Sequence, residues 1–150
     1  MKVPDGWKKT SLGKIFEFKN GVNAEKSSYG QGIKFINIMD IFQGNFILAE
    51  KISGKILLSD KKIKKNLVIE GDVLFNRTSE ISEEIALTSV YLGNEKVVFG
   101  GFVIKGHPKD KSLDNMFKKY CFFSENVRKE IIRRGQGAVR TNIGQKDLSK

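Results

Sequence analysis

The strongest helical pattern in this chain of 150 residues is LDNMFKKYCFFSENVRKEIIRR, residues 113–134. Its apolar side chains recur at the spacing i, i+3, i+4, i+7 and i+8 that lines one face of a helix. These side chains are Leu113, Met116, Phe117, Tyr120 and Cys121. Ser112 can cap the start of the helix, Gly135 can end it, and Ser124 with its polar neighbours offers a break within it. We therefore predict a C-terminal amphipathic helix in one or two pieces.

The predicted strands lie almost entirely before this helix. Each is a short run rich in β-branched and aromatic residues, bounded by glycine or polar turn residues. The runs are Ile33–Ile38, Leu67–Ile69, Val73–Phe75, Ile85–Leu92 and Lys96–Ile104. Gly93-Asn94-Glu95 joins the last two runs and predicts an antiparallel hairpin, while Gly100-Gly101 indicates a bulge or a close backbone approach. This order predicts one α+β domain over residues 1–150, with a twisted, mostly antiparallel sheet and the C-terminal amphipathic helix packed on it.

The charge balance points to a polyanionic partner. The chain carries 27 Lys and Arg against 17 Asp and Glu, a formal net charge of +10, which favours DNA, RNA or an anionic membrane. No run reaches the roughly 18 apolar residues that a membrane helix requires, and the first residues lack the apolar region of a secretory signal. Cys121 is the only cysteine, so neither an internal disulfide nor a multi-cysteine zinc site can form. We expect a protein of the reducing cytoplasm.

Sequence patterns for cofactor or metal chemistry are weak. Gly30-Gln31-Gly32 lacks the third glycine of a dinucleotide-binding loop, and the sequence holds no Walker-type loop. His107, the only histidine, precedes Pro108 in an expected loop, where a solvated side chain is the ordinary state. We therefore expect no cofactor, no metal ion and no catalytic residue.

Two other functions remain open at this point. Pro4-Asp5 followed by Glu17-Phe18-Lys19 matches a short nuclease-like pattern, in which two carboxylates and a lysine hold Mg²⁺ and an attacking water. That chemistry places the first carboxylate on a strand, whereas Asp5 lies in a polar terminal stretch. The second possibility is a protein-interaction module whose basic surface meets an acidic partner.

Residues suited to nucleic-acid binding concentrate in the expected loops. Arg can pair two donors with guanine, Asn and Gln can do the same with adenine, and Lys and small hydroxyls usually contact phosphates. The polar string from Asn76 to Ser79 directly follows the predicted strand Val73–Phe75, as binding loops on a sheet commonly do. For each residue, a merely solvated loop position is the competing interpretation. The first candidates for base or backbone contact are Arg77, Asn76, Thr78, Arg140, Asn142 and Tyr29, and the further phosphate candidates are Gln145, Lys146 and Lys26.

Several blocks follow one another in a suggestive order over nearly the whole chain. They are Trp7–Ile15 with Asn20-Gly21, Gly32–Ile41, Gly71–Thr78, Phe99–Ile104 with the helix that contains Tyr120, and Gly135–Leu148. No single block is specific, but their order and spacing resemble the target-recognition domains of type I restriction-modification specificity subunits.

The resemblance implies a chain that binds one short half of a split duplex DNA target and is not itself an enzyme. In such systems the specificity subunit docks a DNA methyltransferase (modification) subunit and a restriction subunit, which carry out the chemistry. A full specificity subunit has two recognition domains spaced by long helices, whereas the spacer helix and second recognition domain are absent from these 150 residues. We therefore expect as partners duplex DNA, the methyltransferase and restriction subunits, and a second recognition domain or a second copy of this chain.

Overall fold

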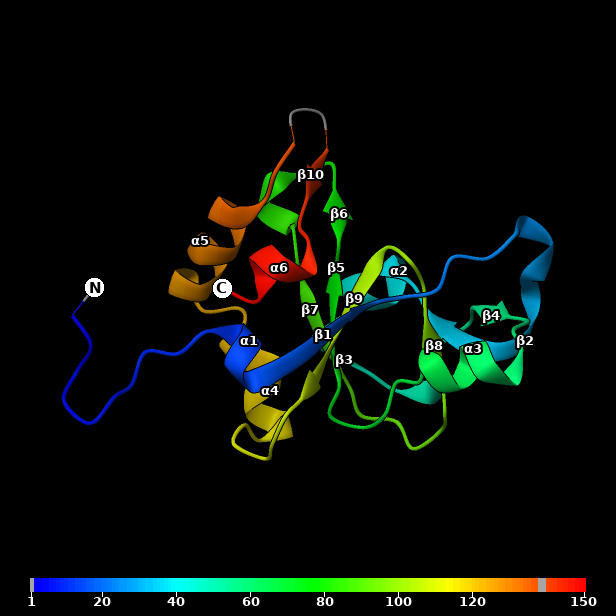
Figure 1. Cartoon of the computed structure of the whole chain (residues 1–150), viewed down its shortest axis with the longest axis horizontal. Helices are drawn as coiled ribbons and strands as arrows, with labels where there is room; N and C mark the ends of the chain where they lie inside the picture. The colour runs from blue at the N-terminus through cyan, green and yellow to red at the C-terminus, as the bar shows by residue number, and fades with distance from the viewer. Residues whose placement is uncertain (1, 138–139) are drawn as a thin grey trace.

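A five-stranded sheet forms the centre of the computed structural model, which describes residues 2–137 and 140–150 (Figure 1). The strands, in their order across the sheet, are β1 (Phe16–Asn20), β9 (Val103–Pro108), β5 (Val73–Asn76), β7 (Thr88–Tyr91) and β3 (Phe46–Ile47). β1, β9, β5 and β7 pair antiparallel with one another in this order, and β3 pairs in parallel with β7 at the edge of the sheet. The expected α+β class with a mostly antiparallel sheet is confirmed.

The burial of the strands follows from their sequences. VLFN of β5 and TSVY of β7 are buried along their whole length, because chain packs on both faces of the sheet at this point. In the edge strand β1, Phe16 and Phe18 join the larger core, whereas Glu17 between them is exposed. The alternation of side chains along a strand explains this difference.

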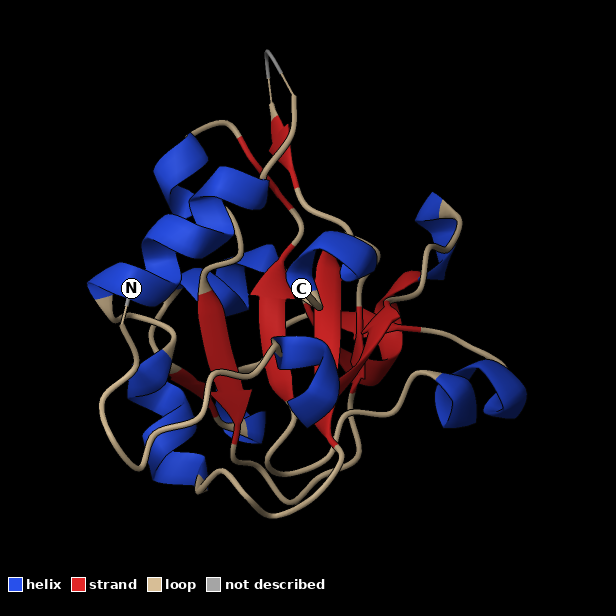
Figure 2. Ribbon diagram, turned by 60° about the vertical axis from the view of Figure 1, so that its left-hand side comes forward, coloured by secondary structure: helices blue, strands red, loops and turns tan. Residues whose placement is uncertain are grey.

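Helices of the C-terminal part of the chain cover one face of the central sheet, together with α1 (Leu12–Ile15) (Figure 2). The C-terminal helices are α4 (Asn115–Cys121), α5 (Glu125–Arg134) and α6 (Gln145–Leu148). The rings of Phe16, Phe75 and Phe122 meet under them, with Phe75 and Phe122 edge to face and their centroids 5.3 Å apart. Such aromatic pairs contribute roughly 0.5–1.5 kcal/mol beyond their burial. The predicted packing of the C-terminal helical segment against the sheet is therefore confirmed.

The helix predicted over residues 113–134 is divided, and Ser124 marks the break before α5. Asp114, rather than the expected Ser112, caps α4, because its carboxylate accepts two backbone N–H groups of the first turn at 2.8 and 3.4 Å. Gly135 follows the last residue of α5, as predicted. Within the two described ranges, no helix combines the length and apolar character needed to cross a bilayer.

A smaller lobe packs against the opposite face of the sheet (Figure 1). Leu74 and Tyr91 of the central sheet meet Ile36 and Phe99 of this lobe in a second core. The lobe contains the sheet β4-β2-β8, made of β4 (Lys55–Ile56), β2 (Tyr29–Ile36) and β8 (Val98–Phe99), with α2 (Ile38–Phe42), α3 (Asp60–Lys65), η1 (Lys26–Ser28) and η2 (Ala49–Lys51) beside it. A short helix, α1 (Leu12–Ile15), leads into β1.

A two-stranded ladder extends beyond the central sheet (Figure 1). β6 (Thr78–Ser79) continues from β5 and pairs antiparallel with β10 (Thr141–Asn142). The short helix η3 (Ser82–Glu84) supports the ladder, since the hydroxyls of Ser82 and Thr141 lie 2.7 Å apart. Ala138 and Val139, which belong to the closing sequence block, lie outside the described residues. We call this element the β6–β10 ladder.

The expected hairpin between Ile85–Leu92 and Lys96–Ile104 is wrong. β7 pairs with β5 and β3, β8 pairs in parallel with β2, and β9 passes between β1 and β5. The second predicted strand is split at Gly100–Phe102, where the backbone turns against Gly21. A Cβ added to Gly21 would lie only 2.1 Å from the carbonyl oxygen of Gly100. The close backbone approach expected at Gly100-Gly101 is therefore present, and it separates β8 from β9.

Candidate nucleic-acid interface

Three connections of the chain meet at one edge of the central sheet. β1 and β5 end there and β9 begins there, because Asn20 pairs with Ile104 and Asn76 pairs with Val103. The connections are residues 21–25 after β1, Arg77 after β5, and the turn Gly100–Phe102 before β9. We call the surface that these three connections form, together with the β6–β10 ladder, the loop edge.

Asn76 lies beneath the loop edge. It is fully buried, and its side-chain N–H₂ group donates to the carbonyl oxygens of Thr78 at 3.3 Å and Glu84 at 3.0 Å. These bonds hold the chain where it passes from β5 into β6. The expected DNA contact of Asn76 is therefore corrected: it is a last strand residue with no exposed surface, and it positions the residues that follow it.

Arg77 lies at the centre of the loop edge and is half-buried. Its backbone N–H donates to the carbonyl oxygen of Phe102 at 2.8 Å, and its Nη1 donates to the carbonyl oxygen of Gly101 at a long 3.4 Å. A guanidinium carries five N–H donors, so this contact with Gly101 occupies a small part of its capacity. The two bonds orient the side chain along the Gly100–Phe102 turn and leave donors for an acceptor outside the protein.

The β6–β10 ladder brings Thr78, Asn142 and Arg140 together. Thr78 faces Asn142 across the ladder, and the Thr78 hydroxyl donates to Oδ1 of Asn142 at 2.8 Å. The Asn142 N–H₂ group donates to the Arg140 carbonyl oxygen at 3.1 Å. Ser79 and Thr141, which pair with each other, are buried on the other side. One face of the ladder therefore presents Thr78 and Asn142 to solvent, and the other face packs inward.

Arg140 forms an exposed ion pair on this ladder. Its Nη2 lies 3.0 Å from Oε1 of Glu80, and both side chains are well exposed to solvent. Exposed pairs of this kind contribute about 0–1 kcal/mol. A phosphate oxygen could replace the Glu80 carboxylate as the partner of Arg140 at little cost in stability.

Tyr29 approaches the loop edge from the smaller lobe. Its ring lies 5.5 Å from that of Phe35 between centroids. Both rings line a cavity of about 240 Å³ together with Asn23, Gly101 and Phe102. Since Arg77 also contacts Gly101, Tyr29 and Arg77 both lie close to the Gly100–Phe102 turn. Lys26 is exposed in η1, just before Tyr29 in the chain, and its position does not join it to the Arg77 group.

Gln145 and Lys146 begin α6 beside the end of β1. Gln145 forms two hydrogen bonds with β1 when its amide nitrogen faces Phe18. The amide nitrogen donates to the carbonyl oxygen of Phe18 at 2.9 Å, and the amide oxygen accepts the backbone N–H of Asn20 at 3.0 Å. Gln145 therefore ties α6 to the central sheet. Lys146 is exposed and is the member of this pair that presents its charge to solvent.

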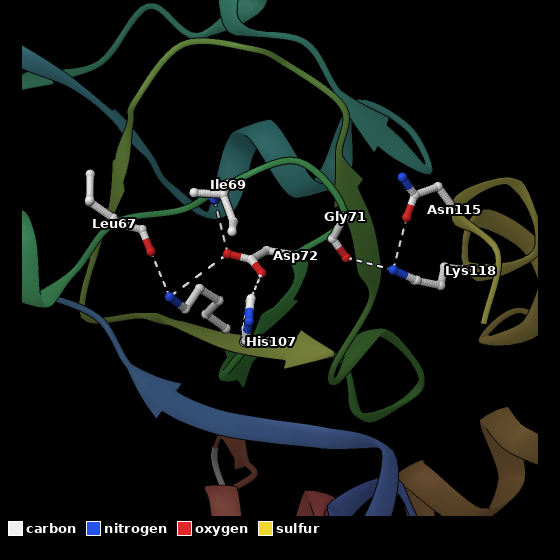
Figure 3. Close-up of polar contacts among 8 residues, drawn as sticks. Leu67, Ile69, Gly71, Asp72, His107, Asn115 and Lys118 are labelled. Atoms are coloured by element: carbon white, nitrogen blue, oxygen red, sulfur yellow. Dashed lines mark hydrogen bonds and ion pairs between the residues drawn. The ribbon is translucent and has the colours of Figure 1, made fainter. Parts of the chain in front are cut away.

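His107 is not the loop residue that the sequence predicts. It lies in β9, and its Nδ1 is 2.6 Å from the carboxylate of the fully buried Asp72 (Figure 3). The same carboxylate accepts the backbone N–H of Ile69 at 3.0 Å and lies 3.8 Å from Nζ of Lys105. Asp72 precedes β5 and Asn76 ends it, so this network lies at the opposite end of β5 from the loop edge. It fixes the turn that leads into the central strand.

Lys118 reinforces the same turn from the helical layer (Figure 3). Its Nζ donates to the carbonyl oxygen of Gly71 and to Oδ1 of Asn115, both at 2.9 Å. Burial lowers the pKa of Lys118 from its ordinary value, which is the direction expected for an amine removed from water. The Gly71-Asp72 turn is thus held from both faces of the sheet.

The nuclease-like residues do not gather. Glu17 and Lys19 share one face of β1 by strand alternation, whereas Asp5 lies in the exposed turn at the start of the chain. Burial, together with the nearby charges of Lys105 and Lys65, lowers the pKa of Lys19. Among residues 2–137 and 140–150, no three His, Cys, Asp or Glu side chains are grouped so that they could hold a metal ion.

Reasoning from the sequence did not select Asn23 or Phe102 as site residues. The Asn23 side chain packs directly on Gly101, since a Cβ added there would lie 1.8 Å from its Oδ1. Phe102 is 66% exposed although it is a large apolar residue. The Gly100-Gly101 pair before an aromatic residue was the available signal, because paired glycines permit a tight turn that projects the next side chain.

The fold is similar to that of several known structures. No protein-family model and no curated protein matches the sequence. A structure described as showing complex assembly and conformational transition of the type I R-M system matches all of this chain with a TM-score of 0.65 and 18% identity. The type I restriction-modification S subunit from M. genitalium matches with a TM-score of 0.60 and 18% identity, and the HsdS subunit from Thermoanaerobacter tengcongensis with 0.64 and 19%.

The likeness covers 100% of this chain in each case, but only 34%, 35% and 33% of the three known chains. At 18–19% identity it shows that the fold is shared. The chain therefore has the fold of about one third of these proteins, and the resemblance noted in the sequence is confirmed at the level of the fold.

Proposed function

We propose that this chain is a target-recognition domain of a type I restriction-modification specificity subunit, and that it binds one part of a DNA target sequence in duplex form. The observation that carries the proposal is the whole-chain likeness to S-subunit structures, with a TM-score of up to 0.65. The loop edge of this chain adds a chemical argument, because it gathers Arg77, Thr78, Asn142 and Arg140 on connections of a rigid sheet.

Arg77 has the chemistry and position for base readout in this proposal. Its guanidinium is held against Gly101 by one long hydrogen bond and can offer two parallel donors to O6 and N7 of guanine. Thr78 and Asn142 keep lone pairs and donors beyond their mutual bond. They are therefore suited to a second base edge or to the sugar-phosphate backbone.

Arg140 and Lys146 are the proposed phosphate contacts. Both are exposed, and Arg140 can exchange its Glu80 partner for a phosphate oxygen. The formal charge of +10 supplies a favourable long-range attraction for DNA. Phosphate contacts position the protein, and contacts to base edges specify the sequence.

In this proposal, partner subunits carry out the catalytic steps. We infer that the bound domain directs a methyltransferase subunit and a restriction subunit to the target, in the cytoplasm, and that this chain itself carries no cofactor. About two thirds of each known S-subunit chain lies outside the region that this chain matches, and docking of those partners is part of the proposal. The nuclease alternative is not favoured, since Asp5 is not brought to Glu17 and Lys19.

Selection from a randomised duplex library tests the proposal. The purified chain is incubated with the library, and bound duplexes are recovered and sequenced over several rounds. We expect a short enriched motif whose affinity, measured by fluorescence anisotropy, falls steeply with added salt because phosphate contacts release counterions. Enrichment of no motif, or binding that is indifferent to salt, would favour the protein-interaction module instead. Incubation of plasmid with the chain and Mg²⁺ should leave the plasmid intact.

A further inference from the structure

The cavity beside Arg77 is lined by aromatic and amide side chains, which contacts with phosphates and paired bases do not require. It measures about 240 Å³, and the loop-edge residues Asn23 and Gly100–Phe102 are among those that line it. Tyr29, Phe35 and Phe102 contribute aromatic side chains to its wall, and Asn23 and Asn37 contribute amides. Sites for drug-sized ligands span roughly 300–1,000 Å³, so this cavity suits a smaller flat group with polar edges.

Two of the aromatic residues that line the cavity are exposed. Phe102 is 66% exposed and Tyr29 is 41% exposed. Leaving a ring of this size in water sacrifices a large part of the roughly 1.5–3 kcal/mol that burial of a Phe side chain supplies. An exposed ring at the rim of a binding surface therefore indicates a stacking surface for a partner.

The position of the cavity connects it to the proposed base contacts. Gly101 lines the cavity and also accepts the Arg77 guanidinium. Asn23 packs on the same glycine, in a contact that leaves no space for a Cβ. Arg77 and the cavity therefore share one turn, which places the cavity next to the proposed base contact.

We propose that this cavity binds one nucleobase of the DNA target that has left the base stack. Tyr29 and Phe102 supply the stacking surfaces, and the Asn23 amide supplies hydrogen bonds to the polar edge of the base. Aromatic stacking with hydrogen bonds to a base edge is the chemistry by which proteins hold unstacked bases. The inference rests on the proposed function, since it requires that the loop edge faces duplex DNA.

Two variants separate the cavity from the rest of the interface. Phe102→Ala removes a stacking surface while its backbone carbonyl remains available to the Arg77 N–H. Gly100→Val adds volume beside the cavity, because a Cβ at this position meets the ring of Phe35 at an ordinary 3.6 Å. Phe117→Ala is the matched control, since Phe117 is 55% exposed on α4 and does not line the cavity.

The experiment uses the duplex selected from the random library, with 2-aminopurine placed in turn at each purine position. Permanganate oxidation reports unstacked pyrimidines on the same duplex. We expect one position to become fluorescent or reactive when the wild-type chain binds. Phe102→Ala and Gly100→Val should abolish that signal, and Phe102→Ala should weaken binding by roughly 5- to 150-fold, the loss typical of one base stacked on an aromatic ring. Phe117→Ala should leave both unchanged.

The outcomes distinguish this inference from the function on which it rests. Failure to select any motif contradicts the proposed function itself. Sequence-dependent binding with no unstacked base at any position overturns the cavity inference and leaves the proposed function in place. An unstacked base whose signal persists in both cavity variants also overturns it, because the base would then be held elsewhere.

Discussion

Replacement of Arg77 by alanine should weaken binding to the selected duplex far more than it weakens the protein. Within the part of the chain that the structure describes, the side chain makes one hydrogen bond, to the Gly101 carbonyl oxygen at 3.4 Å, which at that length contributes at most about 1 kcal/mol to stability. The shorter 2.8 Å bond to Phe102 comes from the backbone N–H of Arg77 and survives the substitution. Chemical denaturation should therefore show a small change in the free energy of unfolding.

The loss on DNA is expected to be larger and to depend on sequence. A bidentate contact between arginine and guanine is worth about 1–3 kcal/mol of discrimination, so binding should fall by roughly 5- to 150-fold. Fluorescence anisotropy with the selected duplex, and with duplexes altered at each base pair in turn, measures both effects. One position of the target should become tolerant of substitution in Arg77→Ala.

Arg133→Ala is the control for charge alone. Arg133 is exposed on α5, paired with Glu130 at 2.8 Å, and it does not belong to the loop edge. Its removal should produce a small loss of equal size on every duplex. If Arg77→Ala likewise lost affinity equally on all sequences, Arg77 would be a phosphate contact and the readout that we assign to it would be wrong.

Three further predictions concern the scaffold and its single thiol. Asp72→Ala leaves Lys105 and His107 without their buried carboxylate partner and should destabilise the fold by about 3 kcal/mol in urea titrations; a change near zero would refute the network's structural role. Phe75→Ala removes a fully buried ring that packs edge to face on Phe122 and should cost ~3–5 kcal/mol, whereas a loss under ~1 kcal/mol would mean that the core is not packed as described. Burial raises the pKa of Cys121 to about 11, so its thiol is almost wholly protonated at pH 8. Alkylation should therefore be slow in the folded chain at pH 8, faster as the pH approaches 11, and fast at pH 8 once the chain is unfolded. Rapid alkylation of the native chain at pH 8 would contradict the burial of this thiol.

The elements with strong local patterns were predictable from the sequence. The apolar spacing of residues 113–134 predicted the helical layer, and the polar residues around Ser124 predicted its division. The Gly71-Asp72 turn before Val73–Phe75 predicted β5. In each case the signal lies within a few residues and does not depend on which distant segment becomes the neighbour.

Strand pairing and the polar network depend on distant segments, and here reasoning from the sequence failed. Gly93-Asn94-Glu95 predicted a hairpin, but β7 gains more by pairing with β5 in the buried centre of the sheet. His107 was placed in a loop because nothing near it in the chain reveals Asp72, 35 residues earlier. Pairing of β5 with β9 brings these two residues together.

The structure brings together some of the residues that the sequence analysis proposes as DNA contacts, and their binding role stays a prediction. The ladder that joins Thr78 to Asn142 links segments 64 residues apart, and the sequence analysis predicts both residues as DNA contacts from their chemistry and their place in the ordered blocks. Asn76 was misjudged because a polar residue after an apolar run suggests a loop, whereas here it is the last buried residue of the strand. Phe102 was overlooked because an apolar residue in a predicted strand is ordinarily part of the core.

The structure of this chain bound to its selected duplex would test the central claim most directly. We predict that the duplex lies along the loop edge, with Nη atoms of Arg77 about 2.7–3.2 Å from acceptors on a base edge and with Arg140 against the phosphate backbone. A duplex bound instead to the outer face of α4 and α5, with Arg77 facing solvent, would contradict the claim.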